Sequence, residues 1–155
     1  MATVELRFSA LPAHVRTARL IAAAVARRSG VDESILDEVR LAVGEACSRA
    51  VELHRQFCPD VPVEVHLSDD DSRFEVVVRD SAPVDGTLGA GALEALEHEA
   101  AAEDPRMDGG IPDPLPPGVG LAVIGGLVDE VEVQAGAAGA RVRMRWPASS
   151  SHSAA

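Results

Sequence analysis

The sequence predicts an α+β domain, a two-layer α/β sandwich in which helices cover one face of a mixed, largely antiparallel sheet. Two kinds of periodicity indicate this class. Several short segments alternate apolar and polar residues, as half-buried strands do, and others repeat apolar residues every three or four positions, as helices do. Their order is strand, two helices, two strands, a long loop, then a helix and two strands. Strands and helices in this order pack as two layers.

The first elements follow from local patterns. Residues 3–8 alternate and predict a strand. Pro12 is tolerated in the first turn of a helix, so a helix is expected from there to near Gly30. Asp32 or Ser34 can cap the helix that follows by accepting its free backbone N–H groups.

The helix expected over residues 36–54 organises the rest of the chain. Its stripe of apolar residues, spaced by three and four, comprises Ile35, Leu36, Val39, Ala42, Val43, Ala46, Cys47, Ala50 and Leu53. Glu45 lies at the edge of this stripe, and Arg49 follows one turn later, close enough for a charge-assisted contact. Such a carboxylate is either half of a structural ion pair or a working group, and spacing alone leaves both readings open.

A β-hairpin is predicted next, because residues 61–67 and 74–78 alternate on either side of a short acidic link. Pro62 indicates either an edge strand or the start of a strand, since proline cannot donate to a sheet ladder. Asp80 follows the hairpin. Its carboxylate could accept a hydrogen bond from an exocyclic amine, or it could cap the turn that follows.

The C-terminal half begins with a loop rich in glycine and proline, residues 81–117, in which residues 92–103 could form a helix. A helix is expected over residues 118–128. The last two strands are expected at residues 131–133 and 142–146. Residues 1–147 therefore form a single domain, and residues 148–155 are expected to be a disordered tail.

Composition excludes several classes of function. The chain of 155 residues has a formal net charge of −11, which argues against a nucleic-acid surface. The sequence contains no signal peptide and no apolar run of membrane-spanning length, so we expect a cytoplasmic protein without a membrane partner. Cys47 and Cys58 form no CxxC pattern, and the histidines lack metal-ligand spacing, which argues against a metal site.

The turn into the helix at 118–128 is a candidate phosphate site. It reads Pro117-Gly-Val-Gly-Leu121. Glycines let a backbone approach a ligand closely, and a helix N-terminus offers free N–H groups to a phosphate. A tight connection between elements would use the same residues, so this pattern alone does not decide.

Four segments taken together resemble the anti-sigma-factor serine kinases of bacterial partner-switching systems, which are histidine-kinase-like (GHKL, Bergerat-fold) ATPases. These segments are LRFSALPAHVRTAR, DEVRLAVGEACSRAV, FEVVVRD and GVGLAVIGGLVDEVEV. The resemblance covers about residues 3–146. It implies a Bergerat-like fold, an ATP site with magnesium, phosphorylation of a serine on an anti-sigma antagonist, and a homodimer that binds a sigma factor.

The resemblance also implies roles for single residues. Glu45 matches the general base, and Asp80 matches the aspartate that reads the adenine amine. Gly118 and Gly120, with Leu121 beside them, match the phosphate-side positions.

Three features depart from the family pattern. Arg49 stands where the family has a magnesium-binding Asn, and a guanidinium has no lone pair for a cation. A Glu45–Arg49 ion pair would occupy the base, although Arg49 could contact a phosphate directly without magnesium. The turn 81–83 lacks the family's glycines, and the lid segment 113–117 has no Lys or Arg. These departures indicate a degenerate member that keeps the scaffold and has lost the kinase chemistry.

Three functions remain in competition. The first is a regulatory protein that binds a sigma factor, an anti-sigma antagonist, or both. The second is an active ATP-dependent serine kinase in which Arg49 neutralises charge in place of the metal. The third is a nucleotide-binding module that acts on other partners.

Overall fold

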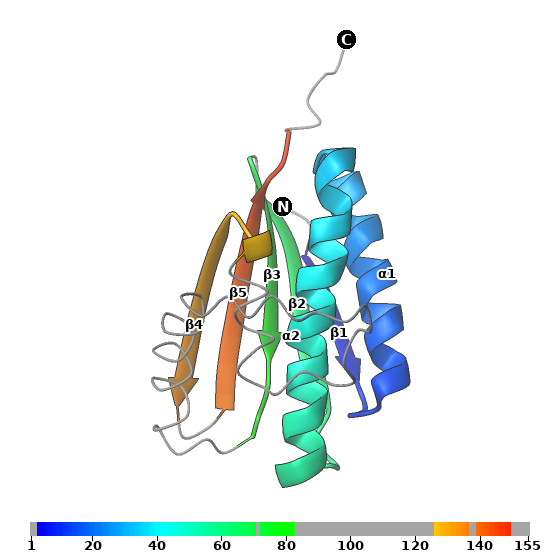
Figure 1. The fold of residues 1–155 in the computed structure, drawn as a ribbon, viewed down its shortest axis with the longest axis vertical. Helices are drawn as coiled ribbons and strands as arrows, with labels where there is room; N and C mark the ends of the chain where they lie inside the picture. The colour runs from blue at the N-terminus through cyan, green and yellow to red at the C-terminus, as the bar shows by residue number, and fades with distance from the viewer. Residues whose placement is uncertain (1–2, 71, 83–125, 137–138, 150–155) are drawn as a thin grey trace, which may run out of the picture.

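The computed structural model describes residues 3–70, 72–82, 126–136 and 139–149 (Figure 1). In these ranges a five-stranded sheet carries two helices on one face, which confirms the predicted α+β class. No helix in the described part is long and apolar enough to span a membrane.

The strands and helices lie close to the predicted positions. In chain order they are β1 (Thr3–Phe8), α1 (Pro12–Arg28), the 3-10 turn η1 (Glu33–Ile35), α2 (Leu36–Phe57), β2 (Val63–Asp70), β3 (Arg73–Arg79), β4 (Glu130–Gly136) and β5 (Gly139–Pro147). The strand order is β1-β2-β3-β5-β4, and all of these neighbours pair antiparallel. Of the helix predicted over residues 118–128, only the end is described, where Gly126 and Leu127 are helical.

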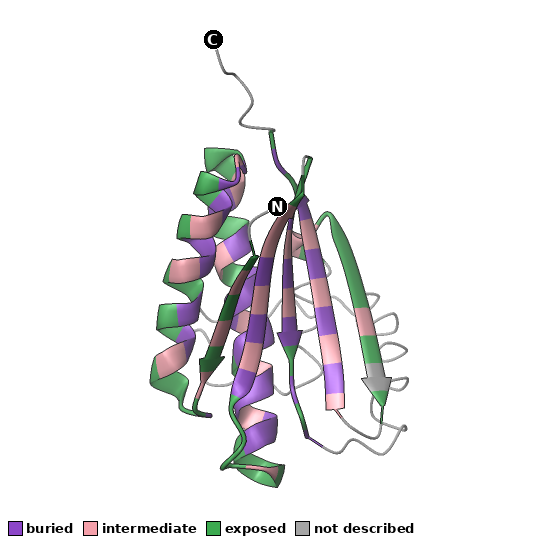
Figure 2. Cartoon of the chain, turned by 180° about the vertical axis from the view of Figure 1, so that it is seen from behind, coloured by how far each residue is buried: buried purple, intermediate pink, exposed green. Residues whose placement is uncertain are grey.

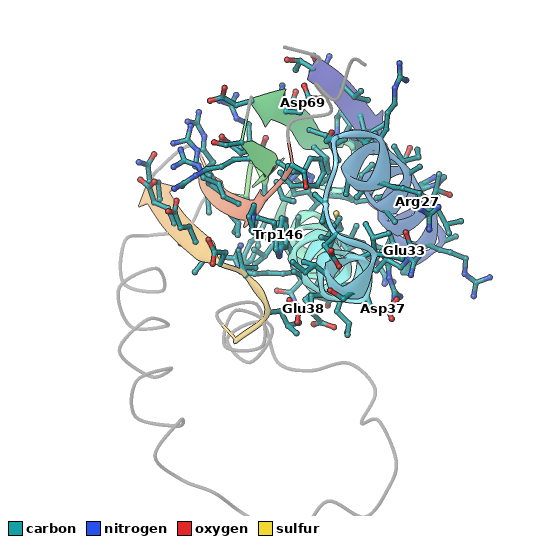
Figure 3. All side chains as sticks on the ribbon, turned by 90° about the horizontal axis from the view of Figure 1, so that it is seen from above. Arg27, Glu33, Asp37, Glu38, Asp69 and Trp146 are labelled. Carbon is teal, nitrogen blue, oxygen red and sulfur yellow. The ribbon has the colours of Figure 1, made fainter. Side chains whose placement is uncertain are left out.

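The core lies between α2 and the three central strands. The inward side chains of β2, β3 and β5 are fully or almost fully buried, and they alternate with half-buried outward ones, as Figure 2 shows along the strands. The predicted α2 stripe is confirmed, because all of its members are buried except Ile35, which is half-buried. Trp146 lies between the sheet and α2 (Figure 3), stacks on Phe74, and donates from Nε1 to the Leu127 carbonyl at 3.2 Å.

The turn between the helices is tied to the end of β5. Gly30 has φ +90°, and a Cβ added there would lie 2.1 Å from the Ser149 carbonyl oxygen, so no side chain fits. The Ser149 N–H donates to the Gly30 carbonyl, and the Ala148 N–H donates to the Ser72 carbonyl, each at 2.9 Å. Ala148 and Ser149, the first residues of the tail predicted at 148–155, make these two backbone hydrogen bonds. Residues 150–155 lie outside the described part.

Two local alternatives are resolved. Asp32 caps the 3-10 turn η1, where its Oδ1 accepts the Ser34 N–H at 2.9 Å. The N-cap of α2 itself is Ile35, which makes no side-chain cap bond, so neither Asp32 nor Ser34 caps α2 as predicted. Pro62 precedes the first residue of β2, and β2 lies between β1 and β3. Pro62 therefore marks the start of a strand, and the edge-strand interpretation is wrong.

The sheet face away from α1 and α2, here called the open face, carries a network of ion pairs. Cross-strand pairs with distances of 2.6 Å are Arg7–Glu64, Arg73–Glu130 and Arg143–Glu75. Arg145 adds a contact of 3.4 Å to Glu75. All these side chains remain between 22% and 61% exposed, so the charges are partly solvated.

Candidate functional site

Two of the candidate site residues, Arg49 and Asp80, meet where α2 crosses the end of β3. The one-turn spacing predicts that Arg49 pairs with Glu45, but the structure does not contain this pair. The Nη1 of Arg49 lies 3.2 Å from Oδ2 of Asp80, the residue after β3. The side chain of Arg49 is 12% exposed and that of Asp80 is 2% exposed. A buried carboxylate needs a partner more than a half-buried one does, so the guanidinium is held by Asp80.

Asp80 fixes the turn that follows β3. Its Oδ1 accepts the Ala82 N–H at 3.3 Å and the Ala140 N–H at 3.2 Å. The Asp80 N–H in turn donates to the Ala140 carbonyl at 3.0 Å. Of the two roles left open from the sequence, turn capping is therefore the one that the contacts support. Both carboxylate oxygens are engaged by the protein itself.

His54 is a site residue that the sequence reasoning missed. It is fully buried on α2, its Nε2 accepts the Ser81 N–H at 2.8 Å, and its Nδ1 lies 2.7 Å from the Val61 carbonyl oxygen. A backbone N–H can only donate, so Nε2 is the acceptor and Nδ1 carries the hydrogen, which makes the ring neutral in this arrangement. The available signal was position: His54 continues the buried stripe of α2 at the helix spacing.

Glu45 lies half-buried on α2 and makes no ion pair with any described residue. Its carboxylate is thus left available, which an ion pair with Arg49 would have prevented. Gly118, Gly120 and Leu121, the predicted phosphate-side residues, lie outside the described part of the chain, as does the segment 113–117.

Neither cysteine is suited to nucleophilic chemistry. Burial raises the pKa of the Cys47 thiol to about 12. Partial burial, and then the negative charge of Asp80, raise the pKa of Cys58. Among the described residues, no group of three or more His, Cys, Asp or Glu side chains is arranged to hold a metal.

The described residues do not fit a magnesium–nucleotide complex. Magnesium requires oxygen ligands in a near-octahedral arrangement, and Arg49 offers only N–H donors and a positive charge. The carboxylate that would read an amine is already occupied by Arg49 and two backbone N–H groups.

Comparison with known proteins establishes the class. The family model of the histidine kinase-like ATPase domain matches residues 8–146. Because this match covers most of the chain, the chain belongs to the histidine kinase-like ATPase domain family.

Within that family the chain is similar to RsbW proteins. The serine-protein kinase RsbW of Bacillus subtilis (strain 168) is 27% identical over 134 residues, which are 84% of this chain and 77% of the relative. The crystal structure of the RsbU and RsbW domains of Rv1364c from Mycobacterium tuberculosis matches with a TM-score of 0.61 and 18% identity over 96% of this chain. This chain spans 34% of that longer chain, and at such identity the likeness shows the fold alone.

Proposed function

We propose that this chain is an anti-sigma-factor-type regulatory protein that binds a sigma factor, an anti-sigma antagonist, or both, in a partner-switching pathway. In this proposal its nucleotide site is degenerate and it transfers no phosphate. The observation that carries the proposal is the Arg49–Asp80 ion pair. By resemblance, Arg49 stands where the family has its magnesium-binding Asn, and its partner Asp80 matches the Asp that reads the adenine amine.

Two further observations support a binding role. The family match extends over residues 8–146, and the described residues form one core that joins α1, α2 and the central strands. The net charge of −11 suits a partner with a basic surface, since opposite charges steer two proteins together. We place the protein in the cytoplasm, where a sigma factor would be met.

The proposal is tested by measuring binding and phosphate transfer separately. Purified chain is titrated by calorimetry with candidate sigma factors and antagonists, with and without magnesium–ATP, and parallel samples receive labelled ATP. We expect a complex whose affinity does not change with nucleotide, and no phosphoserine on the antagonist. Phosphoserine formation that disappears in Glu45→Ala would overturn the proposal.

One observation favours a second candidate, the active serine kinase. Because Arg49 turns toward Asp80, the Glu45 carboxylate is not held by it and could serve as a general base. Arg49→Asn separates the two candidates. If only the metal position was lost, this variant should gain magnesium-dependent nucleotide affinity by roughly tenfold or more, whereas an active wild-type enzyme should lose turnover.

A further inference from the structure

We propose that Arg49 is an intramolecular ligand of Asp80, which completes the site in the place of a nucleotide and holds the turn 80–82 in one conformation. The chain is then permanently in its liganded arrangement. This inference deepens the proposed function and rests on it for one consequence: partner binding that needs no nucleotide.

The first argument is the occupancy of the Asp80 carboxylate. A carboxylate offers about four lone-pair sites. Arg49 and the backbone N–H groups of Ala82 and Ala140 use three of them, at 3.2 to 3.3 Å. Because the side chain is only 2% exposed, an outside donor reaches Asp80 only by displacing Arg49.

The second argument concerns the backbone of the turn. Each of its three N–H groups has an internal acceptor. Asp80 N–H bonds to the Ala140 carbonyl at 3.0 Å, Ser81 N–H to His54 Nε2 at 2.8 Å, and Ala82 N–H to Asp80 Oδ1 at 3.3 Å. Buried donors normally find a partner, and here no ligand is required to supply one. The turn is satisfied as it stands.

The third argument is steric. Gly139, the first residue of β5, has φ +118°, and a Cβ added there would lie 2.0 Å from the Asp80 carbonyl oxygen. The backbone of β5 therefore packs directly against the turn. His54 on α2 accepts from Ser81 and Ala140 on β5 donates to Asp80, so two elements hold the turn and leave it little freedom to open.

These contacts also explain why Arg49 is the occupant. It comes from α2, whose buried stripe is fixed by the core, so its guanidinium is delivered to Asp80 at no cost in translational freedom. A free nucleotide must compete with a group that is always present. Its apparent affinity equals its intrinsic affinity multiplied by the fraction of molecules in which Arg49 is displaced, so a rarely displaced Arg49 weakens binding strongly.

The experiment compares Arg49→Ala with the matched variant Arg40→Ala. Arg40 is on the same helix and pairs with Asp37 at 2.6 Å, where the Asp37 side chain is 86% exposed. Methylguanidinium is the probe for the vacated site, and ADP without magnesium is the nucleotide probe. Thermal unfolding and amide hydrogen exchange at residues 80–82 are the readouts.

We expect Arg49→Ala to lower Tm and to regain about half or more of the loss in methylguanidinium, with a rise that follows the logarithm of its concentration. Wild type and Arg40→Ala should show no such rise. In wild type, exchange at residues 80–82 should be slow and unchanged by ADP, whereas Arg49→Ala should bind ADP about tenfold or more tightly than wild type.

Three results would overturn the inference. One is wild-type protein in which ADP slows exchange at residues 80–82. Another is a folded Arg49→Ala variant, judged by circular dichroism, that neither methylguanidinium nor ADP stabilises. If Arg49→Ala fails to fold, Arg49→Lys replaces it, and an unchanged Tm in Arg49→Lys would show that guanidinium geometry is immaterial. None of these readouts uses a partner, so an absent sigma-factor complex would remove the proposed function while leaving the occupied site intact.

Discussion

The Arg49–Asp80 pair and the network on the open face use the same two chemical groups in opposite environments. The buried pair is separated by 3.2 Å, with side chains 12% and 2% exposed. The open-face pair Arg73–Glu130 is closer, at 2.6 Å, yet its side chains are 48% and 45% exposed. If distance ranked ion pairs, the open-face pair would matter more. Burial reverses this order, because removing one partner inside the protein leaves an uncompensated charge.

The comparison also separates two functions of charge in one domain. Open-face side chains share partners, since Glu75 contacts both Arg143 and Arg145. Any one of them can be replaced by water. Asp80 has no such freedom, because its partners are a helix side chain and two backbone groups. A single substitution at position 49 thus changes the contacts of the site, whereas a single substitution on the open face leaves most of its ion pairs in place.

The largest effect should come from Asp80→Ala. This change leaves the Arg49 guanidinium buried without a counter-charge and removes the acceptor of two backbone N–H groups, so we expect a loss of about 3–5 kcal/mol in the free energy of unfolding. Urea denaturation followed by circular dichroism measures it. Asp37→Ala, on the exposed pair of the same helix, is the control. A loss below about 1 kcal/mol would show that water compensates Arg49 and would remove the contrast.

The next largest effect should come from His54→Leu. The apolar side chain fills most of the volume but leaves the Ser81 N–H and the Val61 carbonyl without their ring partners, and each unsatisfied buried group costs about 1–3 kcal/mol. Hydrogen exchange should also accelerate at Ser81. His66→Leu on β2, whose ring is 32% exposed, should cost less. Equal losses of unfolding free energy in the two variants would contradict the role of His54 as a buried residue that bonds both Ser81 and Val61.

Arg143→Ala on the open face should cost less than about 1 kcal/mol. Its partner Glu75 retains Arg145, and all three side chains reach solvent. The small effect should shrink further as salt is added, because partly solvated charges are screened. Denaturant titrations at low and high ionic strength measure it. A loss of unfolding free energy as large as that of Asp80→Ala would mean that the open-face charges are as shielded from solvent as Asp80.

The smallest effect, visible only through its pH dependence, should come from Glu130→Gln. The hydrogen bond from Arg73, opposed by some desolvation and reinforced by the charges of Arg73 and Arg145, lowers the pKa of Glu130 below its usual 4.5. The folded state therefore holds its carboxylate ionised at a pH where the unfolded state is protonated. The stabilisation is present above pH 4.5 and is lost as the pH falls through the lowered pKa. Tm values of wild type and variant should differ slightly at neutral pH and converge in acid.

The fold was predictable because its signals are local. The period of apolar residues in α2 and the alternation in β2 and β3 place each side chain on a face without knowledge of the partner element. Asp32 and Pro62 were also read from local chemistry, although each left two alternatives. The family resemblance identified Glu45, Arg49 and Asp80 as the positions to inspect.

The contacts of the site were not predictable in the same way. Arg49 and Asp80 are 31 positions apart, and the two meet only because α2 crosses the end of β3 at one particular height. Spacing favoured Glu45, four residues away, since a helix brings such neighbours together in any fold. His54 gave no pattern of its own, because one histidine on a buried stripe looks like a packing residue until its two backbone partners are known.

The position of β5 in the sheet has a consequence for synthesis on the ribosome. β4 pairs with β5, which follows it in the chain, and β5 also completes β3. While the chain emerges, β1, β2 and β3 can pair with one another. Among the described strands, β3 keeps an unpaired edge and β4 has no partner until β5 appears. The nascent protein therefore passes through an interval in which these strand edges are open, and that interval lasts until β5 has left the exit tunnel.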